Sequence, residues 1–374
     1  MPLREQFLLD PGVAYLNHGG FGATPIPVVA HRERLLREFE RNPTRATLAD
    51  LIPDVDAALG ELAHTLGVPV ETLAFTNNTT VGLNLIARSV MPTLNRGDEV
   101  LVTDVEYGSQ LILWDFICRK REASLRTVRL CGVHPAAVPD AVEEALTDRT
   151  RIVMMSHISS MTALRLPVEE VAQRVARHGS VFVVDGAHAP GQVALDLPSI
   201  GADYYVGNLH KWYAAARPAG FLYATRERQE RLDPLVINWG GVDRAETLAS
   251  RTHLPGTSDT SQWLSVPTAI EFHKTFLAPA RDRARRLLEE TAEALALLGF
   301  ERIGRQNDDL MMSSWWLPAE IDGDTLAARL LQNQIEAVVG THDERPLLRI
   351  CVAWYTVEAE LERLLETCDK ARVG

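Results

Sequence analysis

Two apolar runs of the sequence each end in a side chain that could take part in chemistry. Residues 181–184 lead into Asp185, and residues 204–206 lead toward Lys211. Both runs are typical of strands that are buried on both faces of a parallel sheet. In open α/β sheets, ligands bind beyond the carboxyl ends of the strands. We therefore expect Asp185 and Lys211 to face one site, although a strand-end Asp often only caps a helix and most lysines are solvated.

Lys211 lies between His210 and Trp212, so bulky side chains would enclose its amine. Burial lowers the pKa of an amine and makes it a nucleophile. Together with a carboxylate on the neighbouring strand, this pattern predicts a site for pyridoxal phosphate (PLP). Lys211 would form the Schiff base, and Asp185 would keep the pyridine nitrogen protonated so that the ring draws electrons from the substrate.

The phosphate of such a cofactor needs donors of its own. Residues 75–82 carry a strand end into a helix N-terminus that contains Asn78 and Thr79. Free N–H groups and the helix dipole favour an anion there, although ordinary helix capping explains the same residues. Further candidate donors are Asn208, His210 and the loop at residues 255–258.

Composition sets the class of protein. The chain has 374 residues, of which 46% are hydrophobic and 24% charged, which is typical of a globular protein with ample core. A net charge of −12 disfavours nucleic-acid and membrane-surface binding, and no apolar run has the length of a membrane span. The N-terminus lacks the apolar core of a signal peptide. The four cysteines form no CxxC pair, so we expect no metal site and a reducing cytoplasm.

Strand and helix patterns alternate between residues 73 and 224, which predicts a doubly wound, mostly parallel α/β sheet of seven strands. The expected strands are residues 73–76, 100–104, 125–130, 152–158, 181–185, 204–207 and 220–224.

The pattern changes after about residue 261, where longer helical segments dominate. We expect helices there at residues 268–276, 281–298, 324–334 and 357–368, and a strand at residues 347–352. One further helix is expected near the N-terminus, at residues 27–41. The change of pattern predicts a large α/β domain over residues 16–257 and a smaller α+β domain made of residues 1–15 and 258–374.

Over essentially its whole length the chain resembles the fold-type I PLP enzymes of the class V aminotransferase group, which includes the cysteine desulfurases. Within that group it is most similar to the isopenicillin N epimerase-like branch. The likeness extends from residues 16–25 to residues 349–355. The residues that carry it are Asp185, His188, Lys211, Asn78 and Thr79.

The resemblance implies roles for individual residues around the cofactor. Lys211 is the Schiff-base lysine, Asp185 pairs with the pyridine nitrogen, and His188 contacts the ring oxygen. Tyr107 stacks on the ring, and Ser160 stands near the ring oxygen, where desulfurases tend to have asparagine. The phosphate-binding positions are Asn78, Thr79, Asn208 and His210.

Substrate and subunit contacts are also implied by the resemblance. Arg349 matches the arginine that clamps the substrate α-carboxylate, a group that a guanidinium suits well. A salt bridge to a surface acid is the alternative for Arg349. Asn17 and His18 belong to a Gly-rich turn near the substrate. Gly256 and Thr257 resemble a pair that reaches the phosphate of the neighbouring subunit, which implies a homodimer with shared sites.

The chain departs from the desulfurase pattern at one segment. Desulfurases carry a mobile loop with a sulfur-accepting cysteine shortly before the carboxylate-binding arginine. Here residues 338–346 contain no cysteine, and Cys351 lies on the expected strand itself, where we expect it to be buried. Persulfide chemistry is therefore disfavoured.

The expected reaction begins when Lys211 removes the Cα proton of an amino acid, and three outcomes follow from it. We place epimerisation or racemisation first, with Tyr107 or His18 returning a proton on the opposite face. β-Elimination, as in a C–S lyase that acts on a cysteine conjugate or sulfoxide, comes second. Transamination comes third.

Two hypotheses come from other classes of protein. A non-catalytic descendant would have no reason to keep Lys211, Asp185 and Arg349 together. A dinucleotide-binding dehydrogenase would need a GxGxxG motif after its first strand, and the sequence has none there. The substrate expected from the sequence is therefore an amino-acid-type small molecule.

Overall fold

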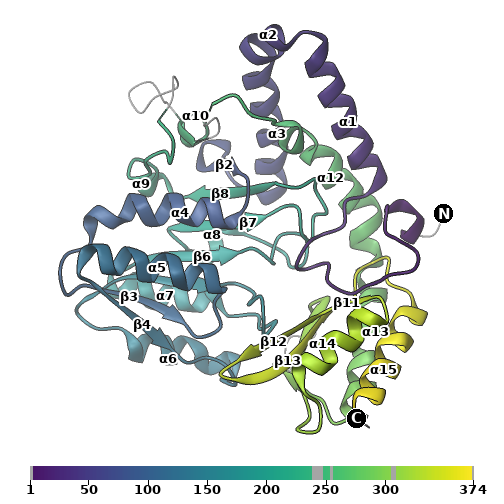
Figure 1. Ribbon diagram of the computed structural model, residues 1–374. Helices are drawn as coiled ribbons and strands as arrows, with labels where there is room; N and C mark the ends of the chain where they lie inside the picture. The colour runs from purple at the N-terminus through teal and green to yellow at the C-terminus, as the bar shows by residue number, and fades with distance from the viewer. Residues whose placement is uncertain (1–2, 238–246, 253–255, 305–308, 373–374) are drawn as a thin grey trace.

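The seven-stranded sheet that the sequence predicts is the centre of the computed structural model, which describes residues 3–237, 247–252, 256–304 and 309–372. Its strand order is β2-β8-β7-β6-β5-β3-β4. Every pairing among β3 to β7 is parallel, and β8 runs antiparallel to both of its neighbours (Figure 1). The strands are β2 (Leu73–Thr76), β3 (Glu99–Thr103), β4 (Ser124–Val128), β5 (Thr150–Ser156), β6 (Val181–Gly186), β7 (Tyr204–Asn208) and β8 (Gly220–Ala224). The expected fold class is confirmed, and the expected strands were displaced by a few residues at most.

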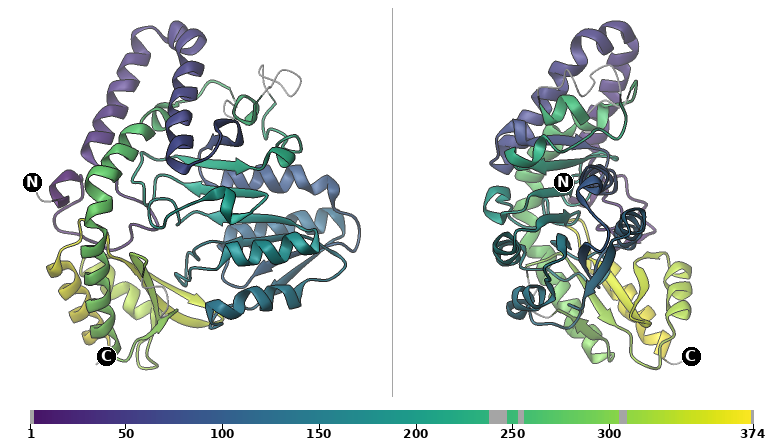
Figure 2. Two further views of the ribbon diagram at one scale, coloured as in Figure 1. Left: turned by 180° about the vertical axis from the view of Figure 1, so that it is seen from behind. Right: turned by 90° about the vertical axis from the view of Figure 1, so that its left-hand side faces the viewer.

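Helices cover both faces of this sheet because successive strand residues point to opposite sides. Val100 and Val102 pack with the helices of one face, and Leu101 packs with those of the other. The first face carries α4 (Thr79–Val90) and α5 (Gly108–Arg121). The second carries α6 (Val138–Ala145), α7 (Val168–His178) and α8 (Leu197–Ile200). Figures 1 and 2 show these helices in two layers with the strands between them.

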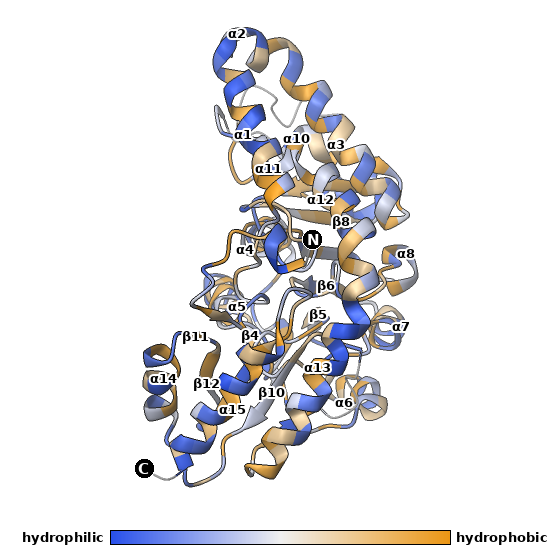
Figure 3. Cartoon of the chain, turned by 90° about the vertical axis from the view of Figure 1, so that its right-hand side faces the viewer, coloured by the Kyte–Doolittle hydropathy of each residue, from blue (hydrophilic) through white to orange (hydrophobic). Residues whose placement is uncertain are grey.

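A second, antiparallel sheet lies in the C-terminal part of the chain, with the order β12-β13-β10-β9. Its strands are β9 (Glu301–Ile303), β10 (Met312–Trp316), β12 (Val338–His342) and β13 (Arg345–Cys351). The segment compared above with a mobile loop is thus the hairpin of β12 and β13. The helices of this part are α13 (Ala278–Leu297), α14 (Gly323–Gln332) and α15 (Glu358–Arg372). Figure 3 shows polar and apolar residues alternating along α13 and α15, as expected of helices with one buried face.

The N-terminal segment links the two sheets. Strand β1 (Ala14–Tyr15) pairs in parallel with β11 (Ile335–Glu336). Helices α1 (Ile26–Arg41) and α3 (Leu51–Leu66) form a hairpin that projects from the rest of the chain (Figure 1). The remaining short helices are Leu3–Gln6, Pro43–Arg45, Ala46–Asp50, Val70–Thr72, Met91–Thr93, Pro135–Ala137, Arg226–Gln229, Leu248–Thr252, Ser261–Leu264, Val266–Phe272 and His273–Leu277. Among the described residues, no helix combines the length and the apolar character that a membrane span requires.

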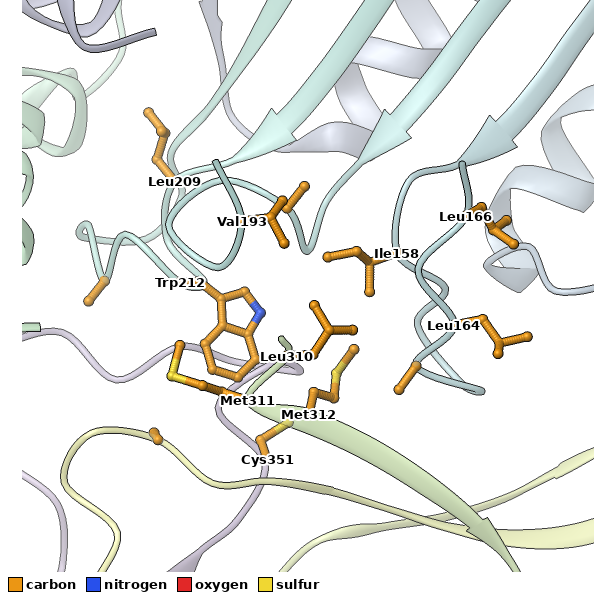
Figure 4. Packing of buried hydrophobic residues seen from close by; sticks show 14 of the residues in the cluster. Ile158, Leu164, Leu166, Val193, Leu209, Trp212, Leu310, Met311, Met312 and Cys351 are labelled. Atoms are coloured by element: carbon orange, nitrogen blue, oxygen red, sulfur yellow. The ribbon is translucent and has the colours of Figure 1, made fainter. Parts of the chain in front are cut away.

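Buried apolar side chains fill the junction between the two sheets. Trp212, from the loop after β7, packs beside Met311, Met312 and Cys351 from the C-terminal part (Figure 4). Trp212 and Cys351 are fully buried, so the expectation that Cys351 belongs to the core is confirmed. Because one core cluster runs through both parts, the division between residues 257 and 258 stays a prediction.

We predict that Gly186→Ala destabilises the fold. A Cβ at Gly186 would lie 2.2 Å from ring atoms of Tyr205, and Tyr205 is itself held by a stacked Phe221 and by a 3.0 Å hydrogen bond with His157. Overpacking at such a site should lower the free energy of unfolding by about 1–3 kcal/mol, measured by urea denaturation without cofactor. The control is Gly60→Ala in α3, where a Cβ meets no atom within 4 Å. Equal unfolding free energies for the two variants would contradict the prediction.

Candidate active site

A cavity opens at the carboxyl edge of the large sheet, where β6 and β7 end. Asp185 occupies the end of β6, and Lys211 follows β7 by three residues. The two strands pair in parallel with Asp185 opposite Val206, so the sheet register brings the predicted carboxylate and amine to one edge. The lining residues are Gly20, Phe21, Asn78, Thr79, Thr80, Tyr107, Ser156, Ile158, Ser160, Asp185, Ala187, His188, Asn208, His210 and Lys211.

The amine of Lys211 is held by a neutral partner. Its Nζ lies 2.9 Å from Nε2 of His188. Burial lowers the pKa of Lys211, the charge of Asp185 opposes that shift, and Arg349 adds to it. Burial also lowers the pKa of His188 well below its usual value, with the charges of Lys211 and Arg349 acting in the same direction. The site therefore keeps the imidazole neutral and brings the pKa of the Lys211 amine down to about 8, closer to neutral pH.

The carboxyl group of Asp185 is the second buried titratable group. Burial raises its pKa, whereas a hydrogen bond from the Ala187 N–H to Oδ1 (2.9 Å) and the charge of Lys211 lower it. A buried carboxylate favours a cationic partner strongly, because the partner offsets the cost of removing its charge from water. Asp185 is thus suited to hold the proton on a heterocyclic nitrogen.

The start of α4 forms the end of the cavity that could take a phosphate. Asn78 caps the helix, and its Oδ1 accepts from the Val81 N–H at 2.9 Å. Asn208 reaches across from β7, and its Oδ1 accepts from the Thr79 N–H at 3.0 Å. His210 lies beside them, with Nδ1 2.6 Å from the Ala219 carbonyl oxygen. These four predicted residues meet at one helix N-terminus, where an anion is favoured.

Arg349 is a buried cation whose hydrogen-bond partners are neutral. It lies in β13 and is only 4% exposed. One guanidinium nitrogen donates to the Ser160 carbonyl oxygen at 2.6 Å, and the other donates to Asn17 Oδ1 at 2.7 Å. Its Nε is buried without a hydrogen-bond partner in the described part of the chain, and no carboxylate there pairs with it. An anionic ligand would supply the missing charge.

His18 does not face the cavity. Its ring is fully buried, with Nε2 3.0 Å from the Lys211 carbonyl oxygen and Nδ1 2.9 Å from the Tyr355 hydroxyl. Burial lowers the pKa of His18 to about 3. The side chain therefore anchors the backbone of Lys211. Tyr107, by contrast, lines the cavity and is 53% exposed, just before α5. Gly256 and Thr257 are exposed and lie outside the cavity.

Sequence reasoning missed Glu106, a buried carboxyl group next to Tyr107. It accepts hydrogen bonds from the Thr103 hydroxyl (2.6 Å), the Ser156 N–H (3.0 Å) and the Ser156 hydroxyl (2.5 Å). Ser156 stands directly opposite Asp185 in the β5–β6 register. Burial raises the pKa of Glu106 to about 7, and the charge of Asp185 adds to that rise. The only signal in the sequence was a second acid, two residues after Asp104, at the end of an apolar run.

Comparisons with known sequences agree with this geometry. The aminotransferase class-V family matches residues 14–364. The isopenicillin N epimerase of Amycolatopsis lactamdurans is 35% identical over 393 aligned residues, which cover 97% of this chain and 96% of that protein. A probable cysteine desulfurase of Vibrio cholerae is 26% identical over 402 aligned residues, which cover 99% and 96%.

Solved structures also resemble this chain. A mutant of the protein C-DES with glycine covalently linked to its PLP cofactor superposes with a TM-score of 0.88 at 22% identity, over 99% of this chain and 100% of that one. The cysteine desulfurase CsdA of Escherichia coli gives a TM-score of 0.85 at 22% identity, over 99% and 97%. At this identity the likeness confirms the fold class.

We predict that Glu106→Gln removes a pH dependence of stability. The pKa of Glu106 is raised on folding, from about 4.5 to about 7, so its contribution is fully present below the lower value and is lost as the pH rises through the higher one. Between pH 5 and 8 the wild-type chain should therefore lose about 2–3 kcal/mol relative to the variant. Urea unfolding of both cofactor-free proteins across this pH range measures the difference. If the unfolding free energies of the two proteins change with pH in parallel, the raised pKa does not belong to Glu106.

Proposed function

This chain belongs to the aminotransferase class-V family, and on that premise we propose that it is a PLP-dependent amino-acid epimerase of the isopenicillin N epimerase type. The observation that carries the proposal is the buried edge at which Lys211, His188 and Asp185 meet. It occurs in a chain that aligns with an isopenicillin N epimerase over 97% of its length.

The residues of the cavity fit PLP. When bound, this cofactor supplies an aldehyde for the lysine amine and a protonated ring that accepts the electron pair of the Cα–H bond. Asp185 would hold the ring-nitrogen proton, and Lys211 would hold the aldehyde carbon. The N-terminus of α4 with Asn78, Thr79, Asn208 and His210 would hold the phosphate. Tyr107 would cover a ring face, with His188 and Ser160 beside the ring oxygen.

The chain's own groups account for binding and proton removal. Arg349 would take the α-carboxylate in its guanidinium, which the Asn17 and Ser160 oxygens orient. The amine of Lys211 would then take the Cα proton as a general base, because burial lowers its pKa to about 8, which makes the unprotonated form accessible near neutral pH. The neutral His188 ring next to Nζ would orient that amine.

Epimerisation needs a second group that returns a proton to the other face of Cα. Of the two residues considered in the sequence, Tyr107 lines the cavity and His18 is turned away from it. Tyr107 comes from the end of β3 and Lys211 from the end of β7, with β5 and β6 between them in the sheet. We therefore assign proton return to the Tyr107 hydroxyl.

We also propose a cytoplasmic homodimer with shared sites. Gly256 and Thr257 are exposed outside the cavity of their own chain, which suits contact with a neighbouring phosphate. Leu235 and Val236 are part-exposed apolar residues in a groove beside the adjacent Ser258. All four cysteines are free thiols, as a reducing compartment favours. Light scattering of the holoenzyme at twice the chain mass is the check.

We predict that Lys211→Ala abolishes covalent attachment of the cofactor. Borohydride treatment of the wild-type holoenzyme should add reduced cofactor to the chain, as seen by intact mass, and should add none to the variant. Turnover should fall at least about a thousandfold with the loss of the general base. Lys120→Ala, on the exposed surface of α5, is the control. Trapping that survives in Lys211→Ala would remove the basis of the proposed function.

We predict that the enzyme interconverts the Cα epimers of isopenicillin N and introduces solvent deuterium at Cα. Tyr107→Phe should slow this interconversion by about 100-fold or more, while the absorbance of the bound cofactor persists. Chiral chromatography and NMR in D2O follow both changes. Full retention of configuration would reject epimerisation. Release of pyruvate and ammonia from cysteine-type substrates would instead support β-elimination, and dependence on an added keto acid would support transamination.

A further inference from the structure

The tip of the β12–β13 hairpin, in the C-terminal part of the chain, contacts residues at the ends of β3 and β4 in the large sheet. The two strands are joined by a two-residue turn, Asp343–Glu344, whose φ angles are 46° and 63°. Positive φ at both central residues is the geometry of a tight hairpin turn that matches strand twist. The turn therefore directs the side chains of His342 and Asp343 from a short, rigid tip.

Asp104 receives this tip at the carboxyl end of β3. Its carboxylate caps the chain after β4, with Oδ1 2.7 Å from the Leu130 N–H and 3.3 Å from the Cys131 N–H. Nε2 of His342 lies 3.7 Å from Oδ2 of Asp104, and the two side chains are only 11% and 10% exposed. This spacing is longer than a hydrogen bond, so the two side chains form a packed contact that is an ion pair only when the imidazole is protonated.

A second, more exposed ion pair lies next to this contact. Asp343 pairs with Arg129, which lies just after β4. Ligand atoms of Asp104, His342 and Asp343 all fall within 4.8 Å of one another. The Asp104 carboxylate already accepts backbone hydrogen bonds and Asp343 already pairs with Arg129, so both carboxylates have partners without a metal ion. Nε2 of His342 is buried and has no hydrogen-bond partner among the described residues.

The position of Arg349 also depends on the contact between the hairpin and the large sheet. It lies on β13, about 20 Å along the strand from the turn at the usual rise per residue. Its partner Ser160 belongs to the loop after β5 in the large part. In the same loop, Met161 lies against Gly340 of β12, where a Cβ would approach its sulfur to 2.9 Å, and Ser314 of β10 donates to its carbonyl oxygen at 2.7 Å.

We propose that Asp104, Arg129, His342 and Asp343 form a clasp that holds the hairpin on the large sheet and thereby positions Arg349 against Ser160 at the wall of the cavity. The packed junction around Trp212 and Met311 joins the two parts on one side, and the clasp joins them at the tip of the hairpin. The four side chains are positioning residues, because they act through Arg349. In desulfurases the corresponding segment is a mobile loop that carries a cysteine. Here residues 338–346 would instead form a hairpin that is held against the large sheet.

The test uses the holoenzyme with the double variant His342→Gln/Asp343→Asn. The first change removes the imidazole that contacts Asp104, and the second removes the charge that pairs with Arg129. Both keep a similar side-chain size, and Asn tolerates the positive φ of residue 343. Hydrogen exchange of the peptide over residues 338–349 should accelerate about tenfold, since the hairpin then opens more often. Arg129→Gln alone changes an exposed side chain and should give a smaller acceleration in the same peptide, because exposed ion pairs contribute little. Exchange equal to that of the wild type in both variants would overturn the proposal.

Steady-state kinetics separate positioning from mere stability. This arm rests on the proposed function and uses isopenicillin N. In the double variant KM should rise about five- to tenfold, with kcat within about twofold, because binding of the carboxylate is what Arg349 provides. A faster-exchanging hairpin with unchanged KM would overturn the link to Arg349. If the wild type does not turn over this substrate, the proposed function fails, and the exchange experiment still decides the clasp.

Two controls complete the design. Arg174→Ala removes ion pairs of α7 with Asp140 and Glu143 of α6, which involve no residue of the hairpin, and should leave exchange of residues 338–349 and KM unchanged. EDTA added to the wild type should also leave that exchange unchanged. If EDTA accelerates it, a bound metal holds the tip and the direct pairing of the four side chains is wrong.

Discussion

The structure depends on holding a buried amine, Lys211, and a buried carboxyl group, Asp185, close together at one edge of the large sheet. Burial disfavours the charged forms of both Lys211 and Asp185, while each charge favours the other. The parallel sheet satisfies this because its strand ends meet at one edge and its helices exclude water from both faces. His188 contacts the amine as a neutral ring, so it adds a hydrogen-bonding group without adding a competing charge.

Arg349 makes substrate binding and lysine basicity interdependent. Its positive charge lowers the pKa of Lys211, and its hydrogen bonds go to neutral oxygens of Asn17 and Ser160. A carboxylate that binds to Arg349 would cancel that field. The amine would then gain proton affinity at the moment when a Cα–H bond lies within its reach. This coupling follows from placing an unneutralised guanidinium on a strand of the second sheet.

The sequence predicts those parts of the molecule that depend on local pattern. Short apolar and β-branched runs located all seven strands of the large sheet, and the residues after two of them located Asp185 and Lys211. What the sequence could not predict depends on contacts between distant segments. His18 was expected near the substrate, but Trp212, Trp354 and Tyr355 surround it and turn it to the Lys211 backbone. The hydrogen bonds that hold the Glu106 carboxyl group come largely from Ser156, which lies on β5 and is distant in sequence.

The pairing of β1 with β11 has a consequence for how the molecule is made. The segment that anchors the Lys211 backbone follows directly after β1, and β1 has its strand partner at Ile335–Glu336. During synthesis the lysine-bearing loop therefore leaves the ribosome long before the strand that secures its anchor. The large sheet can assemble from sequential strands, whereas the lysine environment is completed only when the two ends of the chain meet. A chain that ends before Ile335 therefore lacks the strand partner of β1, the strand just before the segment that anchors the Lys211 backbone.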